Sequence, residues 1–179
     1  MNFPLKSIQL SNMEIVLRKD FYSKFDNFFK ELASNMGLYF FHHNLIQNYR
    51  EPGHKVSSFG NNEEWSEIYW TKHCNDDPVE KACNLAPQKT GFAISSWQVI
   101  DPTSACMEAR TTICDVKDGL SMAFNHNGLI EHISFGWKKF NFENFSFQKI
   151  AELSQLIDPV RQHHLSTFNN ENPNYKVEV

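Results

Sequence analysis

The chain has 179 residues, 41% of them hydrophobic and 14% aromatic, which is enough for one domain with a substantial core. Seventeen Lys and Arg against twenty-one Asp and Glu give a formal net charge of −4, which disfavours a dedicated nucleic-acid-binding module. Seven Gly and seven Pro exclude a collagen-like or low-complexity chain. No apolar run approaches the roughly eighteen residues of a membrane helix, and the start of the chain lacks a signal-peptide pattern, so we expect a cytoplasmic protein.

The cysteine and histidine patterns do not indicate a metal centre or a catalytic nucleophile. The cysteine spacings match neither a zinc site nor a redox pair, and we expect four reduced thiols: Cys74, Cys83, Cys106 and Cys114. No phosphate-binding loop, dinucleotide fingerprint, HExxH motif or nucleophile with a recognisable base occurs in the sequence. We therefore expect no metal, no cofactor and no enzymatic activity.

The first predicted element is a long helix over residues 11–36. Ser11 and Glu14 form a capping-box pattern at its start, and Gly37 supplies a left-handed stop at its end. Its apolar residues recur at spacings of three and four: Phe21, Phe25, Phe28, Leu32 and Met36. One face of this helix must therefore cover a sheet.

Two strands and a short helix follow. Residues 38–43 and 55–60 read as strands that pair antiparallel around the turn at Pro52-Gly53. Residues 63–74 show the apolar spacing of a helix and end before Asp77-Pro78. This stretch is rich in aromatic side chains, so we expect a short aromatic helix.

The second half of the chain predicts a strand, a helix, a hairpin and a last helix. The strand covers residues 92–97, and Pro102 and Ser104 open a helix that runs to residue 117. Residues 120–124 and 129–135 flank an Asn-Gly pair, which favours a type I′ hairpin turn. A last helix has apolar residues from Phe147 to Val160 at helical spacing, and Pro159 is expected to kink or end it.

This order of elements predicts an α+β fold: an α-β-α sandwich with a mostly antiparallel five-stranded sheet and helices on both faces. The plan is that of PAS-like and GAF-like sensor modules, in which a small-molecule pocket lies between the sheet and one helical layer. We expect residues 1–168 to form this domain and residues 169–179 to form a polar tail or linker.

Five elements in a fixed order indicate a family. They are Trp65, Tyr69 four residues later, the pair Asp77-Pro78, then Trp97, and the hairpin that begins at Gly119. Together with the predicted helices and strands, they resemble the autoinducer-binding domain of LuxR-type quorum-sensing transcription regulators. The resemblance extends over nearly the whole chain.

The resemblance implies a pocket for an N-acyl homoserine lactone, and it implies a role for each matching residue. Trp65 would donate its indole N–H to the lactone carbonyl, Asp77 would accept from the ligand amide, and Trp97 would line the head-group end. Tyr69 would contact the acyl portion, and Ser134 is a candidate polar contact in the last hairpin strand. An Asp opposite a ligand N–H satisfies both buried groups and rejects ligands that lack the donor.

The chain departs from the family pattern at three places. Asn61 stands where the family usually has a Tyr, four residues before the first Trp. The stretch from Trp65 to Asp77 is about one residue shorter than usual, so Asp76 remains an alternative anchor. The stretch from Asp77 to Trp97 is several residues longer, which would reshape the head-group end.

Purely structural explanations also remain open for these residues. The three aromatic residues could be plain core, Asp77 could only open a turn before its proline, and Ser134 could bond only to backbone. Two functions therefore stay open. The first is a ligand-binding sensor domain of a homodimeric transcription regulator, and the second is a ligand-free domain that pairs with a full-length regulator.

Expected partners follow from the same resemblance. A small-molecule signal and a second copy of the chain are expected partners, and a membrane is not. Contact with DNA would require a helix-turn-helix domain, which residues 160–179 are too short to supply. The last five residues look like the linker that precedes such a domain.

Overall fold

The computed structural model describes residues 6–10, 12–85, 87–99, 103–139, 141 and 145–173. It consists of two compact units, residues 1–139 and 140–179, which are treated separately here. The strands of the first unit are β1 (Lys6–Leu10), β2 (Met13–Leu17), β3 (Leu38–Gln47), β4 (His54–Gly60), β5 (Phe92–Ser96), β6 (Asp118–His126) and β7 (Leu129–Trp137). Its helices are α1 (Asp20–Met36), α2 (Glu63–Ile68), α3 (Pro78–Leu85), α4 (Pro87–Thr90) and α5 (Ala105–Cys114), with a π-helical turn η1 (Tyr69–His73) and a 3₁₀ turn η2 (Trp97–Val99). The second unit contains α6 (Phe147–Glu171).

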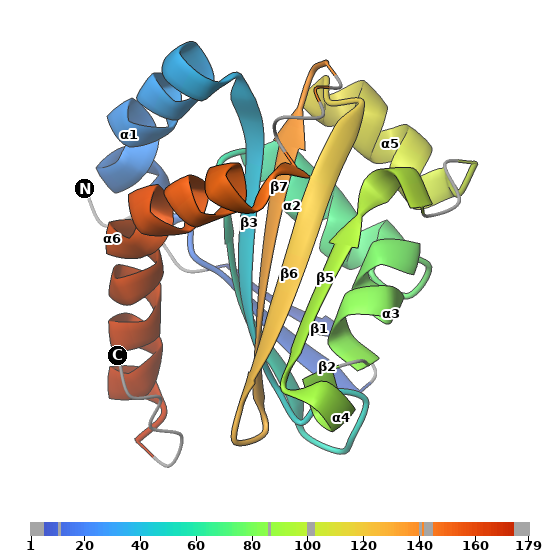
Figure 1. Ribbon diagram of the computed structural model, residues 1–179. Helices are drawn as coiled ribbons and strands as arrows, with labels where there is room; N and C mark the ends of the chain where they lie inside the picture. Colours follow the sequence, from blue (N-terminus) through green and yellow to red (C-terminus); the bar gives the residue numbers. More distant parts are fainter. Residues whose placement is uncertain are drawn as a thin grey trace. The chain divides into compact units, whose positions relative to one another are not determined.

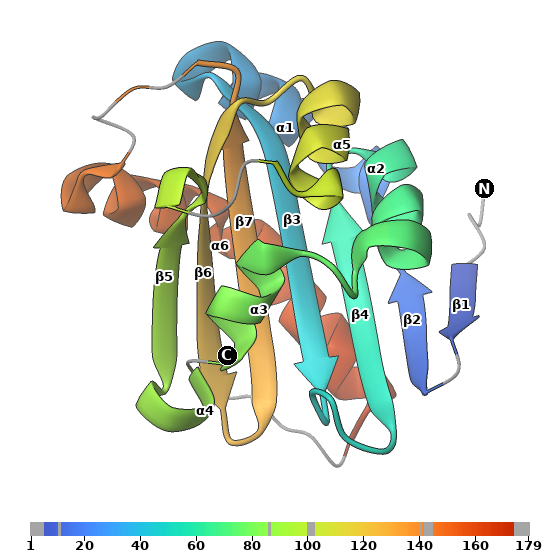
Figure 2. The ribbon, with the colours of Figure 1, turned by 90° about the vertical axis from the view of Figure 1, so that its right-hand side faces the viewer.

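The seven strands form one sheet in the order β1-β2-β4-β3-β7-β6-β5. Figure 1 shows this sheet between α1 and α5. All neighbours are antiparallel except β2 and β4, which run parallel and whose arrows point the same way in Figure 2. The long strands β3 and β7 pair along most of their length at the centre of the sheet. The α+β class and the mostly antiparallel sheet are confirmed, but the sheet has seven strands where five were predicted.

Helices of the first unit cover both faces of this sheet, as predicted. In Figure 2, α2, α3 and α5 lie in front of the sheet and α1 lies behind it. Because successive side chains of a strand point to opposite faces, each strand contributes to both layers. The face toward α2, α3 and α5 is called here the inner face.

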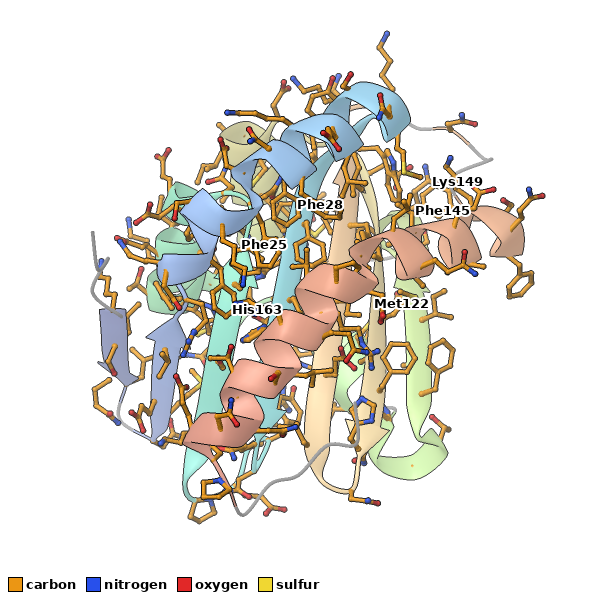
Figure 3. The ribbon with its side chains drawn as sticks, turned by 90° about the vertical axis from the view of Figure 1, so that its left-hand side faces the viewer. Phe25, Phe28, Met122, Phe145, Lys149 and His163 are labelled. Atoms are coloured by element: carbon orange, nitrogen blue, oxygen red, sulfur yellow. The ribbon has the colours of Figure 1, made fainter. Side chains whose placement is uncertain are left out.

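Aromatic packing fixes α1 on the face opposite to the inner face. The ring of Phe21 lies 5.3 Å from that of Phe59, and the ring of Phe29 lies 5.1 Å from that of Phe41. Phe25, labelled in Figure 3, also contacts Phe59 at 6.0 Å. Gly37 ends the helix at a φ of 65° and donates its N–H to the carbonyls of Leu32 and Ala33, as the sequence predicted.

The start of the predicted first helix is wrong. Residues Lys6–Leu10 and Met13–Leu17 form the antiparallel strands β1 and β2, and α1 begins only at Asp20. The alternating burial of Met13, Ile15 and Leu17 is the period of a strand, and β2 gains the parallel partner β4, which local pattern does not reveal. Ser11, the predicted cap, lies outside the described residues.

Two further expectations are corrected. Helices α3 and α4 occupy Pro78–Leu85 and Pro87–Thr90, where no helix was predicted. Pro159 does not end the last helix, because α6 continues through it to Glu171 and includes the first residues of the expected tail. Residues 174–179, which contain the rest of that tail, lie outside the described part.

The predicted Asn-Gly hairpin is confirmed. Asn127 has a φ of 53° and Gly128 a φ of 97°, the two positive values that a type I′ turn requires. This turn joins β6 to β7, and residue 120 of β6 lies opposite residue 135 of β7. None of the described helices is both long enough and apolar enough to cross a membrane.

Two facing glycines near the other end of this hairpin determine where Trp97 packs. Gly119 on β6 pairs with Gly136 on β7, and a Cβ on Gly119 would overlap the indole of Trp97. A Cβ on Gly136 would lie 2.9 Å from Phe40 and 3.3 Å from Trp97. The absence of side chains at both positions therefore leaves a flat patch on which the indole packs.

We expect Gly119→Ala to destabilise the fold by about 1–3 kcal/mol, because the added methyl must push Trp97 from its site. Urea unfolding followed by tryptophan fluorescence measures both the stability and the altered indole environment. Gly37→Ala is the matched control: it introduces strain at a positive φ but has no atom within 4 Å of the new Cβ. An unchanged native-state spectrum in Gly119→Ala would contradict the expectation.

Candidate functional site

The inner face of the sheet is unusually polar for a buried surface. Four central strands place buried polar side chains on it, which are His42, Asn44, Ser58, Ser121, His132 and Ser134. Buried polar groups cost free energy unless they are hydrogen-bonded. Two hydrogen-bonded chains account for all six of them.

The first chain begins at Trp70. Its Nε1 donates to Ser58 Oγ over 2.8 Å, and Ser58 Oγ donates in turn to Asn44 Oδ1 over 2.8 Å. His42 Nε2 lies 3.0 Å from the same hydroxyl. The indole of Trp70 is therefore fully satisfied by the sheet.

The second chain begins at Trp97 and includes the predicted contact Ser134. Trp97 Nε1 donates to Ser121 Oγ over 3.0 Å, and Ser121 Oγ lies 2.7 Å from Ser134 Oγ. Ser134 Oγ is 3.3 Å from His132 Nε2. Ser134 is thus bonded to other side chains, which the sequence did not predict.

Helix α2 and the turn η1 that follows it bring Trp65 and Tyr69 over this face. Asn62 Oδ1 caps the helix by accepting from Trp65 N over 2.8 Å. The neighbouring Asn61 bonds to β3 backbone instead, accepting from Phe41 N and donating to Tyr39 O, so it ties α2 to the sheet. The π-helical turn η1 places both Tyr69 and Trp70 inward, with their rings 4.9 Å apart.

Asp77 has two roles in the structure. Its Oδ1 accepts from Val79 N over 2.9 Å at the start of α3, which is the turn-opening role that the sequence left open. Its Oδ2 accepts from Arg110 Nη2 over 2.6 Å in a buried ion pair. Asp77 is 2% exposed, whereas Asp76 is exposed, so of the two alternatives only Asp77 faces the interior.

Arg110 of α5 links the predicted residues. Its guanidinium carbon lies 4.6 Å from the ring centroid of Trp97 and 5.3 Å from that of Trp65, in addition to the ion pair with Asp77. The same group donates to Met107 Sδ over 3.2 Å. Three of the five predicted residues therefore meet at one side chain.

Arg110 was not among the residues predicted from the sequence, although the pattern of α5 contains a signal for it. Cys106, Met107 and Cys114 lie at helical spacing from Arg110 and are buried with it, so the arginine belongs to the inward stripe of α5. A buried arginine requires a counter-ion. That requirement alone pointed to an unidentified carboxylate partner.

Three buried donor-capable nitrogens in this site have no hydrogen-bond partner among the described residues. They are Trp65 Nε1, Arg110 Nε and His132 Nδ1. An unsatisfied buried donor costs roughly 1–3 kcal/mol. The site therefore has capacity to bind hydrogen-bond acceptors.

Burial keeps the other titratable groups of the site uncharged at neutral pH. It lowers the pKa of His42 to about 3 and that of His132 to about 4, with smaller contributions from neighbouring charges. It raises the pKa of Tyr69 well above its ordinary value, and the carboxyls of Asp77 and Glu80 raise it further. Tyr69 is therefore a neutral phenol.

The cysteines are buried free thiols. Burial raises the pKa of Cys83, Cys106 and Cys114 to about 12 and that of Cys74 to about 11, so none is a thiolate at neutral pH. Among the described residues, no group of three or more His, Cys, Asp or Glu is arranged to hold a metal ion.

A cavity of about 320 Å³ lies away from the predicted site residues. Its lining includes Tyr49, His54, Trp70 and Glu80, at the end of the sheet where β3 turns into β4. None of Trp65, Tyr69, Asp77, Trp97 and Ser134 lines it. The cavity and the cluster around Arg110 are therefore two separate features of the same helical layer.

We expect the two buried histidines to make the fold acid-sensitive. In the unfolded chain each titrates near 6.5, so unfolding takes up protons below that pH and stability falls from pH 6.5 toward 4. Between pH 7 and pH 5, wild type should lose roughly 1–2 kcal/mol more than His132→Asn. Urea unfolding at both pH values measures the difference, and equal losses in the two proteins would contradict the expectation.

We expect the Arg110–Asp77 pair to couple strongly. Asp77→Asn keeps the cap on α3 but leaves a buried guanidinium unpaired, so it should destabilise the fold by about 3–5 kcal/mol. The double variant Asp77→Asn/Arg110→Met removes both charges and should be more stable than Asp77→Asn alone. Denaturant unfolding of the four proteins in this double-mutant cycle tests the coupling, and additive effects would show that the pair is not an interacting unit.

Comparison with known proteins finds similarity in structure only. Neither a protein-family model nor a curated protein matches the sequence. The crystal structure of Escherichia coli SdiA matches with a TM-score of 0.57 at 15% identity, covering 86% of this chain and 64% of that chain. SdiA in complex with octanoyl-rac-glycerol matches with a TM-score of 0.56 at 16% identity, covering 84% and 60% respectively. The chain thus spans less than two thirds of these two SdiA chains.

A third solved structure is CepR2 from Burkholderia cenocepacia, described as an N-acylhomoserine lactone dependent LuxR family transcription factor. It matches with a TM-score of 0.51 at 16% identity, covering 75% of this chain and 76% of that chain. These likenesses agree with the resemblance inferred from Trp65, Asp77 and Trp97, and they establish it for the fold. The chain has the fold of the autoinducer-binding domain of LuxR-type regulators.

Proposed function

We propose that this chain is the small-molecule-sensing domain of a LuxR-type transcription regulator, and that its ligand is an N-acyl homoserine lactone or a related acyl compound. The binding site is the cluster of Trp65, Tyr69, Asp77 and Trp97 between α2, α3, α5 and the inner face, with Ser134 on its floor. Occupancy would stabilise the regulator, which we propose to be a homodimer that contacts DNA through a separate domain.

The observation that supports this proposal most directly is the indole N–H of Trp65. The side chain is 1% exposed, yet no described protein atom accepts from its Nε1. The indoles of Trp70 and Trp97 on the same layer are both satisfied by serine hydroxyls. Trp65 is the residue that the family resemblance assigns to the ligand carbonyl, so its free donor has the chemistry that this role needs.

The solved relatives support an acyl ligand. One SdiA structure contains octanoyl-rac-glycerol, and CepR2 is described as dependent on N-acylhomoserine lactone. Both ligands join an acyl chain, through its carbonyl, to a small polar head group. A buried site with apolar walls and a few placed donors suits such a molecule.

The contacts of Arg110 favour a second candidate function, that of a ligand-free domain. The guanidinium is paired with Asp77 and contacts both Trp65 and Trp97. A side chain of the protein therefore already binds the carboxylate that the resemblance assigns to the ligand amide. A domain filled in this way could fold without a ligand. It would then act by pairing with a full-length regulator.

A thermal-shift titration separates the two functions. With N-octanoyl homoserine lactone or octanoyl glycerol at about a hundred times its Kd, a sensor domain gains about 2.7 kcal/mol, which raises the Tm by roughly 5–10 °C for a chain of this size. A ligand-free pairing domain would show no shift with either compound. Absence of any shift across short and long acyl chains would therefore reject the sensor function.

Two tryptophan variants localise the binding. Trp65→Phe removes the free donor and should weaken binding about tenfold, the loss of one hydrogen bond of roughly 1–1.5 kcal/mol. Trp70→Phe is the matched control, since its indole N–H is committed to Ser58, and it should leave the affinity within about threefold. Isothermal titration calorimetry gives both values, and equal losses in the two variants would remove Trp65 from the site.

A further inference from the structure

Around Arg110, the carboxylate acceptors have protein partners, whereas two N–H donors have none among the described residues. Asp77 is the acidic side chain that resemblance assigns to a ligand N–H, and both of its oxygens have protein partners: Val79 N on Oδ1 and Arg110 Nη2 on Oδ2. The unpartnered nitrogens beside Asp77 are instead Trp65 Nε1 and Arg110 Nε, which can only donate; the third, His132 Nδ1, belongs to the hydroxyl chain on the sheet. A ligand that completes this site must therefore supply acceptors.

From this inventory we propose that the site recognises a neutral carbonyl acceptor through Trp65 and Arg110, and that the ion pair with Arg110 withdraws Asp77 from ligand recognition. This inference rests on the proposed sensor function and names the chemistry of its ligand. An acyl ester would suit the site as well as an acyl amide, because the Asp77 oxygens that would accept from an amide N–H already accept from Val79 N and Arg110 Nη2. Arg110 is then a specificity-determining residue.

Charge in the site favours a neutral acceptor over a carboxylate. Arg110 and Asp77 cancel each other, while burial keeps His42 and His132 neutral at pH 7. The carboxyls of Asp77 and Glu80 both lie near enough to raise the pKa of Tyr69. An anionic head group would enter beside these two carboxyls and would add an uncompensated charge to a buried site.

The position of Arg110 fits the role of a donor. The side chain is 5% exposed, and its guanidinium lies against the indoles of Trp65 and Trp97, which fix its plane. Its Nη atoms are directed to Asp77, Met107 and Cys106, so the described residues leave Nε as the nitrogen without an acceptor. A carbonyl oxygen that accepts from both Nε and Trp65 Nε1 would satisfy two of the three unpartnered nitrogens at once.

Two ligands that differ at one position test the proposal. N-Octanoyl homoserine lactone has an amide N–H, and α-octanoyloxy-γ-butyrolactone has an ester oxygen in its place with the same carbonyls and acyl chain. The full chain is titrated with each compound by isothermal titration calorimetry at pH 7.5. We expect the two Kd values to agree within about threefold.

Variants at Arg110 give the complementary result. Arg110→Lys keeps the positive charge beside Asp77 but lacks the Nε donor, so both ligands should bind about tenfold more weakly. Arg110→Met releases Asp77, which can then accept from the amide, so this variant should prefer the amide over the ester by tenfold or more. Circular dichroism shows whether each variant is folded. If Arg110→Met does not fold, the result with Arg110→Lys still decides the test.

Each outcome decides one of the two proposals. Wild-type affinity for the amide that exceeds affinity for the ester by tenfold or more would overturn the inference and leave the sensor function intact, with Asp77 as the anchor. Equal binding that Arg110→Lys does not weaken would also overturn it. Failure of wild type to bind either compound would reject the sensor function itself.

Discussion

A guanidinium that is excluded from water needs a counter-ion. In this chain the counter-ion comes from a different helical segment, so the ion pair holds the helices over the inner face together. Arg110 enters from α5, and Asp77 stands at the first turn of α3, so their ion pair joins two helices that are far apart in sequence. The same guanidinium lies against Trp65 of α2 and Trp97 of η2. Four segments of the layer over the inner face therefore depend on one charged side chain for their relative placement.

The sheet beneath this layer is adapted to the same arrangement. Facing glycines at Gly119 and Gly136 let the indole of Trp97 approach two strands closely, and Ser121 then receives its N–H. The hydroxyl chain through Ser134 extends from that indole to His132, whose pKa responds to the charges of Asp77 and Arg110. The polar floor and the ion pair above it thus form one electrostatic unit.

Most of the fold could be predicted from local pattern, and the exceptions have physical reasons. The β6–β7 hairpin and the end of α1 followed from Asn127-Gly128 and Gly37, because positive φ values have a strong local signature. The β1–β2 hairpin could not be recognised in the same way, since β2 depends on a parallel partner far along the chain. The site was predicted only in part: its aromatic members and Asp77 came from a family resemblance, whereas Arg110 required knowledge of which helix faces meet.

The parallel pairing of β2 with β4 has a consequence for the order of folding. Strand β4 is presented by its antiparallel hairpin with β3, a local contact that can form early. Strand β2 can add to that edge only after α1 and β3 have reversed the chain, so the amino-terminal hairpin closes the largest loop of this part of the sheet. A nascent chain emerging from the ribosome would accordingly leave the β4-facing edge of β2 unpaired until the β3–β4 hairpin has been synthesised, which exposes that edge to chaperones during the interval.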